Sequence, residues 1–288
     1  MKKSLNVETF ISCDKEYSQA DTVIFGAPFD GTTSYRPGTR FGGKQIRAES
    51  YGIETYSPYQ NKDLEELKVY DGGELELPFG NTEKALEMIE RYAAEVLKDE
   101  KIPVMIGGEH LVTLGAARAA VRKYPDLNIV HFDAHADLRD EYLGEKLSHA
   151  CVLRRCHELT GDGRIYQFGI RSGERKEFEF SETHTYMRKF DLSGLREVCE
   201  KIKGKPVYFT IDLDVLDPSV FPGTGTPEAG GISFNELING IVTVGGLLNV
   251  VAADINELSP PYDQSGISTA AACKALRELL LAIHKEKI

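Results

Sequence analysis

The sequence predicts an α/β protein built on a mostly parallel sheet with helices on both faces. Short runs rich in branched and aromatic residues alternate with longer amphipathic stretches along the chain. This alternation is typical of parallel strands joined by helices. Acidic and imidazole side chains also follow several of the short runs directly, at the place where open parallel sheets bind their ligands.

Seven clear strands and one weaker strand are expected from these runs. The clear ones cover residues 22–26, 69–71, 103–107, 128–132, 165–169, 207–211 and 250–254, and the weaker one covers 183–187. Asn81 or Thr82 is placed to cap a helix over 83–101, in which apolar residues recur at helical spacing. A second helix with one apolar face is expected over 265–285, where it closes the chain.

Composition limits the class of protein. The 288 residues are 41% hydrophobic and no Pro-rich, Ser-rich or like-charged run divides them, so we expect one domain over 1–288. The net charge of -11 disfavours nucleic acid and anionic membranes as partners and favours a cationic small molecule. No apolar run approaches the roughly 18 residues of a membrane span.

Cysteine usage indicates the redox compartment. The five cysteines are odd in number and form no CxxC pair. In a chain of this length, that pattern favours reduced, mostly buried thiols in an intracellular protein rather than a disulfide framework. We therefore expect a cytoplasmic protein in which Cys151 serves only packing.

The stretch 127–137 organises the expected site. A strand-like run leads there into Asp133, His135 and Asp137. Alternate side chains of an extended backbone point the same way, so these three groups are expected to project together. Such a cluster is unfavourable unless a cation lies among its members.

Three further predicted strands deliver similar groups to the same edge of the sheet. The run at 103–107 leads to His110, the run at 207–211 to Asp212 and Asp214, and the run at 250–254 to Glu257. Four carboxylates and two imidazoles are therefore candidate metal ligands, namely His110, Asp133, His135, Asp137, Asp212 and Asp214.

This ligand set favours two divalent cations. It exceeds what one ion takes from a protein, and two divalent ions would balance the four negative charges and share one bridging water. Hard oxygen ligands with only two imidazoles favour Mn²⁺ over Zn²⁺, while nickel and cobalt stay compatible with the ligand types. Structural zinc is disfavoured because no cysteine joins the set.

Two glycine-rich segments, 26–43 and 222–231, are expected to shape the rim of a pocket. Neither matches a P-loop or a dinucleotide fingerprint, so phosphate binding is disfavoured.

Three blocks carry a resemblance to a known family. Residues 107–110 (Gly-Gly-Glu-His), 133–137 (Asp-Ala-His-Ala-Asp) and 212–218 (Asp-Leu-Asp-Val-Leu-Asp-Pro) resemble, in order and spacing, the signatures of the ureohydrolases, the arginase and agmatinase family. The likeness runs from the turn at 26–29 to residues 259–263. It implies a three-layer α/β/α sandwich of about eight strands, a binuclear manganese centre with two Mn²⁺ per subunit, and hydrolysis of a guanidinium group to urea and an amine. It also suggests a homo-oligomer, a trimer or a hexamer.

The family's ligand roles fall on the six candidate ligands, and every one is present. Its proton-shuttling histidine falls on His149, and its guanidinium-binding glutamate on Glu257. The mechanism that follows is attack by a metal-bridging hydroxide on the guanidinium carbon, with Asp137 carrying the proton to the leaving nitrogen. His131 shares the parity of the site, but we expect it, like the histidines at 157, 184 and 284, to have no role in the chemistry; support of the site from behind is the alternative.

Substrate identity depends on residues 138–148. This segment departs from the asparagine- and serine-bearing pattern with which arginases hold an amino acid. Its acids Asp140, Glu141 and Glu145 would suit a cationic tail, and the alternative is that they form a solvated loop face. We therefore expect agmatine, cleaved to putrescine and urea. The alternatives are an arginase, a guanidinobutyrase or a formiminoglutamase and, from another class, a non-catalytic relative that binds a polyamine or a partner protein.

Overall fold

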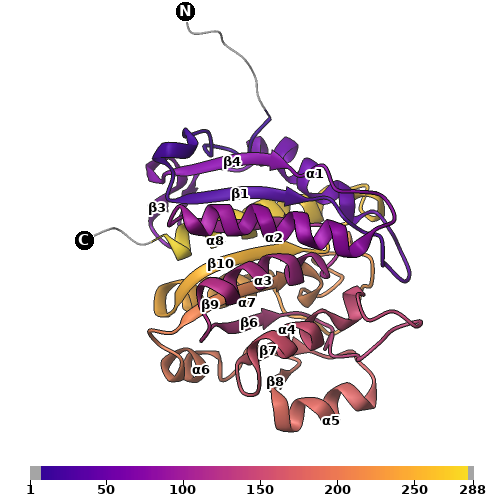
Figure 1. Cartoon of the computed structure of the whole chain (residues 1–288). Helices are drawn as coiled ribbons and strands as arrows, with labels where there is room; N and C mark the ends of the chain where they lie inside the picture. The colour runs from indigo at the N-terminus through magenta and orange to yellow at the C-terminus, as the bar shows by residue number, and fades with distance from the viewer. Residues whose placement is uncertain (1–7, 285–288) are drawn as a thin grey trace, which may run out of the picture.

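An eight-stranded parallel sheet forms the centre of the computed structural model, which describes residues 8–284 (Figure 1). Its strand order is β4-β1-β5-β10-β9-β6-β7-β8. The strands are β1 (Thr22–Ala27), β4 (Val69–Glu74), β5 (Ile102–Gly107), β6 (Asn128–Phe132), β7 (Ile165–Ile170), β8 (Tyr186–Lys189), β9 (Pro206–Asp212) and β10 (Asn249–Asn256). A separate antiparallel pair joins β2 (Tyr56–Ser57) and β3 (Lys62–Asp63).

Helices cover both faces of the sheet, so the expected three-layer α/β/α fold is confirmed. One face carries α2 (Thr82–Lys98), α3 (Val112–Lys123) and α4 (Val152–Thr160). The other carries α1 (Gly42–Glu49), α6 (Leu195–Lys201), α7 (Phe234–Leu247) and α8 (Ile267–Ile283), and α5 (Arg175–His184) contacts β8 at the edge of the sheet. Short 3-10 helices lie at Tyr17–Gln19, Thr39–Phe41, Ser50–Gly52, Leu64–Glu66, His149–Cys151, Leu213–Val215 and Pro260–Tyr262.

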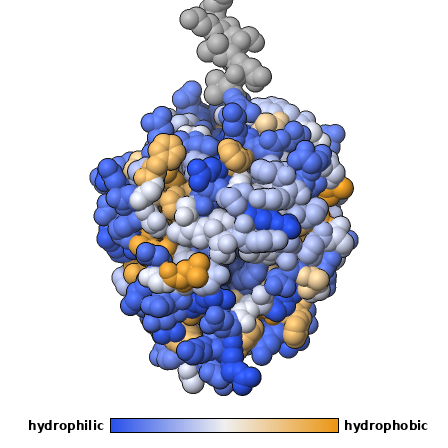
Figure 2. All heavy atoms as spheres, turned by 90° about the vertical axis from the view of Figure 1, so that its right-hand side faces the viewer, coloured by the Kyte–Doolittle hydropathy of each residue, from blue (hydrophilic) through white to orange (hydrophobic). Residues whose placement is uncertain are grey.

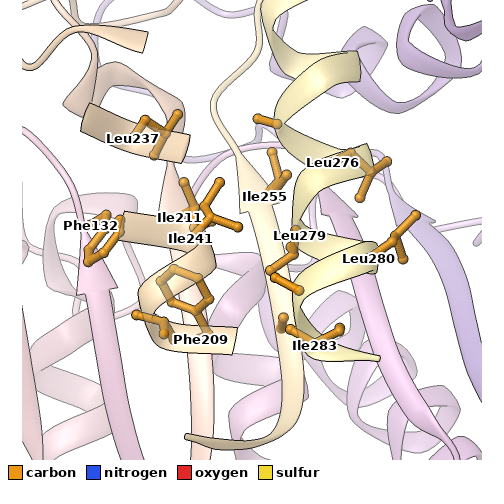
Figure 3. Close-up of a cluster of buried hydrophobic side chains, with 14 of the residues drawn as sticks. Phe132, Phe209, Ile211, Leu237, Ile241, Ile255, Leu276, Leu279, Leu280 and Ile283 are labelled. Atoms are coloured by element: carbon orange, nitrogen blue, oxygen red, sulfur yellow. The ribbon is translucent and has the colours of Figure 1, made fainter. Parts of the chain in front are cut away.

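Strand alternation divides the core into two layers. On β9, Phe209 and Ile211 face the layer of α7 and α8, and Figure 3 shows them packed against Ile241 and Leu279 from these two helices. Tyr208, one residue along, belongs to the opposite layer. Both faces of a central strand are therefore apolar, which explains the nearly continuous hydrophobic runs in the sequence.

Most predicted strand boundaries lie within two residues of those in the structure, but β4 extends three residues further, to Glu74. The weaker strand begins only at Tyr186, because Thr183 and His184 still belong to α5. Helix α2 ends at Lys98, three residues early, and Glu100 follows with a positive φ of 57° that a helix cannot contain. The closing helix spans Ile267–Ile283, and Lys285 lies outside the described residues.

The four strands that were expected to deliver acids and imidazoles are neighbours at the centre of the sheet, in the order β5-β10-β9-β6. Ile106, Ile255, Ile211 and Phe132 lie level with one another near their carboxyl ends. Figure 2 looks onto this edge and shows a mostly hydrophilic surface with separate apolar spots. Within residues 8–284, every helix is too short or too polar to cross a bilayer.

Candidate metal centre and active site

The imidazole of His110 brings three carboxylates together. Its Nδ1 lies 3.0 Å from Asp137 Oδ2 and 3.1 Å from Asp133 Oδ2. Asp212 Oδ2 is 3.5 Å from the same nitrogen. These side chains come from the ends of β5, β6 and β9, so the fold brings together residues that are far apart in the sequence.

A second imidazole faces the other side of Asp133. His135 Nδ1 lies 3.0 Å from Asp214 Oδ2 and 3.5 Å from Asp133 Oδ1. Asp133 therefore turns one oxygen toward each of the two histidines. Asp133, His110 and His135 are thus among the residues that would hold a pair of divalent ions.

The backbone between Phe132 and Asp137 is not an extended strand. Strand β6 ends at Phe132, and Asp137 has a positive φ of 53°. The expectation that Asp133, His135 and Asp137 project together by simple alternation is therefore wrong at Asp137, although its carboxylate does reach the cluster. Its carbonyl accepts hydrogen bonds from the first amides of α4, those of Leu153 at 3.0 Å and Arg154 at 3.2 Å, which hold the turn in place.

Buried partners orient the candidate ligands from behind. His110 Nε2 lies 2.9 Å from Thr210 Oγ1, so a proton on Nε2 leaves the Nδ1 lone pair facing the carboxylates. His131 Nε2 lies 2.8 Å from Asp133 Oδ2, and Gln167 Nε2 lies 3.2 Å from His131 Nδ1. These contacts favour the alternative for His131, in which it supports the candidate ligands from behind.

The chemistry of the donor set fits a pair of divalent cations. Asp133, Asp137, Asp212 and Asp214 are each no more than 5% exposed, and within residues 8–284 their ion-pair partners are imidazoles alone. Burial, together with the charge of Asp133, raises the pKa of Asp137 to about 7, and burial with the charge of Asp214 raises that of Asp212. Without cations the cluster must hold protons in their place.

His149 lies at the wall of the cavity beside the cluster. Burial, followed by the neighbouring His135 and His110, lowers its pKa to about 4. Its amide donates to Thr32 Oγ1 at 3.0 Å, and its Nε2 lies 3.1 Å from Ser34 Oγ. The imidazole of His149 is therefore neutral near pH 7.

Glu109 anchors the segment that supports His149. Its buried carboxylate accepts hydrogen bonds from the amide and hydroxyl of Thr32 and, at 3.0 Å, from the Thr33 hydroxyl. In the sequence, Glu109 appears only as part of the block at 107–110, and no separate role was predicted for it. Its position directly before a metal-ligand candidate was the available signal.

Glu257 is buried beside His110 and is not among the residues that line the cavity described below. Its Oε1 accepts a hydrogen bond from the amide of His110 at 2.8 Å. Its Oε2 lies close to the backbone of Gly225, 3.6 Å from the position that a Cβ atom would take if residue 225 had a side chain. Burial, with the charges of Asp214 and Glu109, raises its pKa well above the usual range. A carboxylate in such surroundings favours a cationic ligand.

A cavity of about 540 Å³ opens beside the cluster. Both glycine-rich segments contribute to its lining, as expected, through residues 34–36 and 226–228. The acids expected to meet the substrate tail do not line it, and Asp140 pairs instead with Arg155 at 2.9 Å. Three carboxylates do line it, those of Asp137, Glu177 and Glu228, and Glu228 accepts a hydrogen bond from Ser172 Oγ at 2.9 Å.

The block 224–228 resembles the agmatinases more than the arginases, but no role was predicted for Glu228 itself because its loop gives no periodic signal. Arg171 fixes this loop by donating to backbone carbonyls, including those of Asp214 at 2.7 Å and Glu228 at 2.9 Å. All five cysteines are buried free thiols, and burial raises the pKa of Cys151 to about 12, in agreement with a packing role.

Comparison with known proteins agrees with this geometry. The Arginase family profile matches residues 20–282. An agmatinase of Bacillus anthracis is 49% identical over 277 residues, which cover 95% of this chain and 96% of that one. A guanidinobutyrase of Pseudomonas aeruginosa is 34% identical, covering 93% and 88%. The crystal structure of agmatine ureohydrolase of Thermoplasma volcanium superposes with a TM-score of 0.89 at 34% identity, covering 97% and 95%. The chain, with its parallel sheet and its cluster of histidines and aspartates at the carboxyl edge, belongs to the arginase family.

Proposed function

We propose that this protein is an agmatinase, which hydrolyses agmatine to putrescine and urea. Relatives of this name match almost the whole chain at 47–49% identity. The observation that carries the proposal is the meeting of four buried carboxylates and two imidazoles beside a cavity with an acidic side chain in its wall. Burying four carboxylates together is energetically unfavourable, which argues against a non-catalytic protein.

The six candidate ligands, His110, Asp133, His135, Asp137, Asp212 and Asp214, would hold two divalent cations. Manganese suits their mixture of carboxylates and imidazoles. When bound, such a pair supplies a nucleophile from water near neutral pH.

The chain's own residues bind and orient the substrate. We assign Glu257 to the guanidinium, because a carboxylate matches its planar fork of N–H donors and the buried position strengthens the attraction. This contact would turn the guanidinium carbon toward the metal cluster. Asp137 is placed to carry a proton to the leaving nitrogen, and neutral His149 to exchange protons with the cavity.

Glu228 is the group that we assign to the ammonium tail of agmatine. The other glutamate of the lining, Glu177, has both oxygens occupied, because they accept the amides of Leu138 at 2.8 Å and Glu174 at 2.7 Å. Glu228 receives only the neutral hydroxyl of Ser172 as a side-chain donor among the described residues, so its charge stays available.

Guanidinobutyrate is the second candidate substrate. It ends in a carboxylate, and the side chain of Arg36 lines the same cavity while packing over the rings of Tyr35 and Tyr262. A guanidinium in this place could bind a carboxylate tail. The two substrates therefore differ in whether Glu228 or Arg36 receives the far end of the molecule.

The experiment is a urea-release assay on protein loaded with Mn²⁺, with metal content measured on the same sample. Agmatine, guanidinobutyrate and arginine are compared at equal concentration. We expect agmatine to be preferred, and Asp133→Ala to lose both metal and turnover. Preference for guanidinobutyrate would replace the substrate assignment, and no urea from any of the three would refute the enzymatic function.

Assembly into a trimer or hexamer and a cytoplasmic location stay predictions. Sedimentation velocity of the purified protein tests the first.

A further inference from the structure

A second group of potential metal ligands lies at the opposite edge of the sheet. His157 lies in α4 and Asp162 in the turn before β7. His184 is the last residue of α5, just before β8. Since β7 and β8 are parallel and both begin here, the group lies at their amino ends, whereas the catalytic cluster lies at the carboxyl ends. We name these three residues the histidine clasp.

One carboxylate oxygen is held between two imidazoles in the histidine clasp. Asp162 Oδ1 lies 2.7 Å from His157 Nε2 and 2.6 Å from His184 Nδ1. One ligand atom from each of the three residues lies within 4.8 Å of the others. Ligands of a tetrahedral ion at about 2.1 Å are roughly 3.4 Å apart, so small side-chain movements would admit an ion.

An aromatic ring holds both imidazoles in position. The Phe180 ring stacks on His184, with centroids 4.2 Å apart at 27°, and meets His157 edge-on at 5.0 Å. The guanidinium of Arg154 covers the Phe180 ring at 3.7 Å. The two histidines are therefore oriented by packing, which lowers the entropic cost of binding an ion.

The backbone fixes the third ligand. Asp162 stands between Gly161 and Gly163, both with positive φ, of 83° and 70°. Gly161 donates to the carbonyl of His157 at 2.7 Å, and Gly163 to the carbonyl of His184 at 2.8 Å. The turn that carries the carboxylate is thus bonded to both histidine-bearing segments, and Asp162 is largely exposed, leaving space for water ligands.

We propose that the histidine clasp is a binding site for a divalent transition metal, such as Zn²⁺ or Ni²⁺, separate from the catalytic cluster. Two imidazoles and one carboxylate, with remaining positions open to water, suit these ions better than Mn²⁺ or Mg²⁺. A bound ion would join α4, the turn before β7 and α5, and so stabilise the outer edge of the sheet. It would reach the catalytic cluster through α4, whose first amides hold Asp137, and through α5, whose Glu177 accepts the amide of Leu138.

The test uses the full chain with its catalytic cluster already filled with Mn²⁺. Ni²⁺ is added in small excess, unbound ions are removed by gel filtration, and both metals are measured by mass spectrometry. We expect the wild type to gain about one Ni²⁺ per chain without losing Mn²⁺. The double variant His157→Gln/His184→Gln should bind Ni²⁺ at least about 10-fold more weakly and keep its Mn²⁺.

Asp126→Asn is the matched control. Asp126 lies at the same edge and pairs with Lys205 at 3.5 Å, outside the histidine clasp. The control should take up Ni²⁺ like the wild type. Nickel gained only in exchange for manganese, or gained equally by the double variant, would overturn the proposal.

A crystal of the wild type soaked in Ni²⁺ gives a measurement that needs no variant. An anomalous-scattering peak about 2.1 Å from His157 Nε2 and His184 Nδ1 supports the site. No peak there at saturating nickel overturns it, and neither experiment depends on the reaction that the enzyme performs.

Discussion

Replacing Glu228 by Gln removes one charge from the cavity wall while keeping the shape of the side chain. The amide oxygen of Gln can still accept the hydroxyl of Ser172, 2.9 Å away in the wild type. The loop itself is held by Arg171 through the backbone carbonyl of residue 228, which the substitution leaves unchanged. The perturbation is therefore confined to the proposed contact with the ammonium tail.

The magnitude follows from the kind of contact that is lost. A hydrogen bond to a charged group contributes about 1.5–3 kcal/mol. Glu228 is partly exposed, so water screens the pair and reduces the loss to about 1–2 kcal/mol. At 1.36 kcal/mol per tenfold change, kcat/KM for agmatine should fall about 5- to 30-fold.

The assay compares urea release from agmatine with release from butylguanidine, which has the same guanidinium but an uncharged tail. Only the reaction of agmatine should weaken in Glu228→Gln. Ser172→Ala removes the hydrogen bond to Glu228 but keeps its charge, so it should change kcat/KM by less. An equal loss for both substrates, or none for agmatine, would refute the assignment of Glu228.

Three other substitutions test the site and its scaffold. Glu257→Gln should lower turnover strongly while both metals stay bound, as measured by metal analysis; loss of the metals would show that its role is different. Asp217→Asn should destabilise the protein by about 1 kcal/mol in urea unfolding at pH 6, after allowance for solvent screening. Hydrogen bonds from Ser219 and from the amides of Gly230 and Gly231 lower the pKa of Asp217 to about 2, so this difference should begin to shrink below about pH 4 and be gone near pH 2; a constant difference would contradict the cause. Phe209→Ala should cost about 3–5 kcal/mol in the same assay because the ring is fully buried, and a loss below about 1 kcal/mol would show that the packing in Figure 3 tolerates the cavity.

The sequence was sufficient to predict the sheet and the convergence of the histidine and aspartate side chains at its carboxyl edge. Buried parallel strands need apolar residues on both faces, so their runs are visible without tertiary information. Parallel strands also end at one edge, so residues that follow them, such as His110 and Asp212, can be grouped before any contact is known. The structure confirms that the four strands concerned are neighbours.

The substrate end of the cavity could not be predicted in the same way. Glu228 reaches the wall because Arg171 binds a set of carbonyls that are far from it in sequence, and no local pattern encodes such a contact. The left-handed turn at Asp137 likewise depends on amides supplied by α4. Charge alone suggested that the acids of the segment 138–148 would bind the cationic tail of the substrate. In the structure, Asp140 forms an ion pair with Arg155 and does not line the cavity.

The position of β10 has a consequence for the order of assembly. It is the last strand of the chain, yet it lies between β5 and β9 in the middle of the sheet. A polypeptide that has not yet received it has its first and second halves on either side of a gap, with His110 separated from Asp212. Cations would therefore bind tightly only once β10 is in place, and their removal should lower the stability of the complete fold.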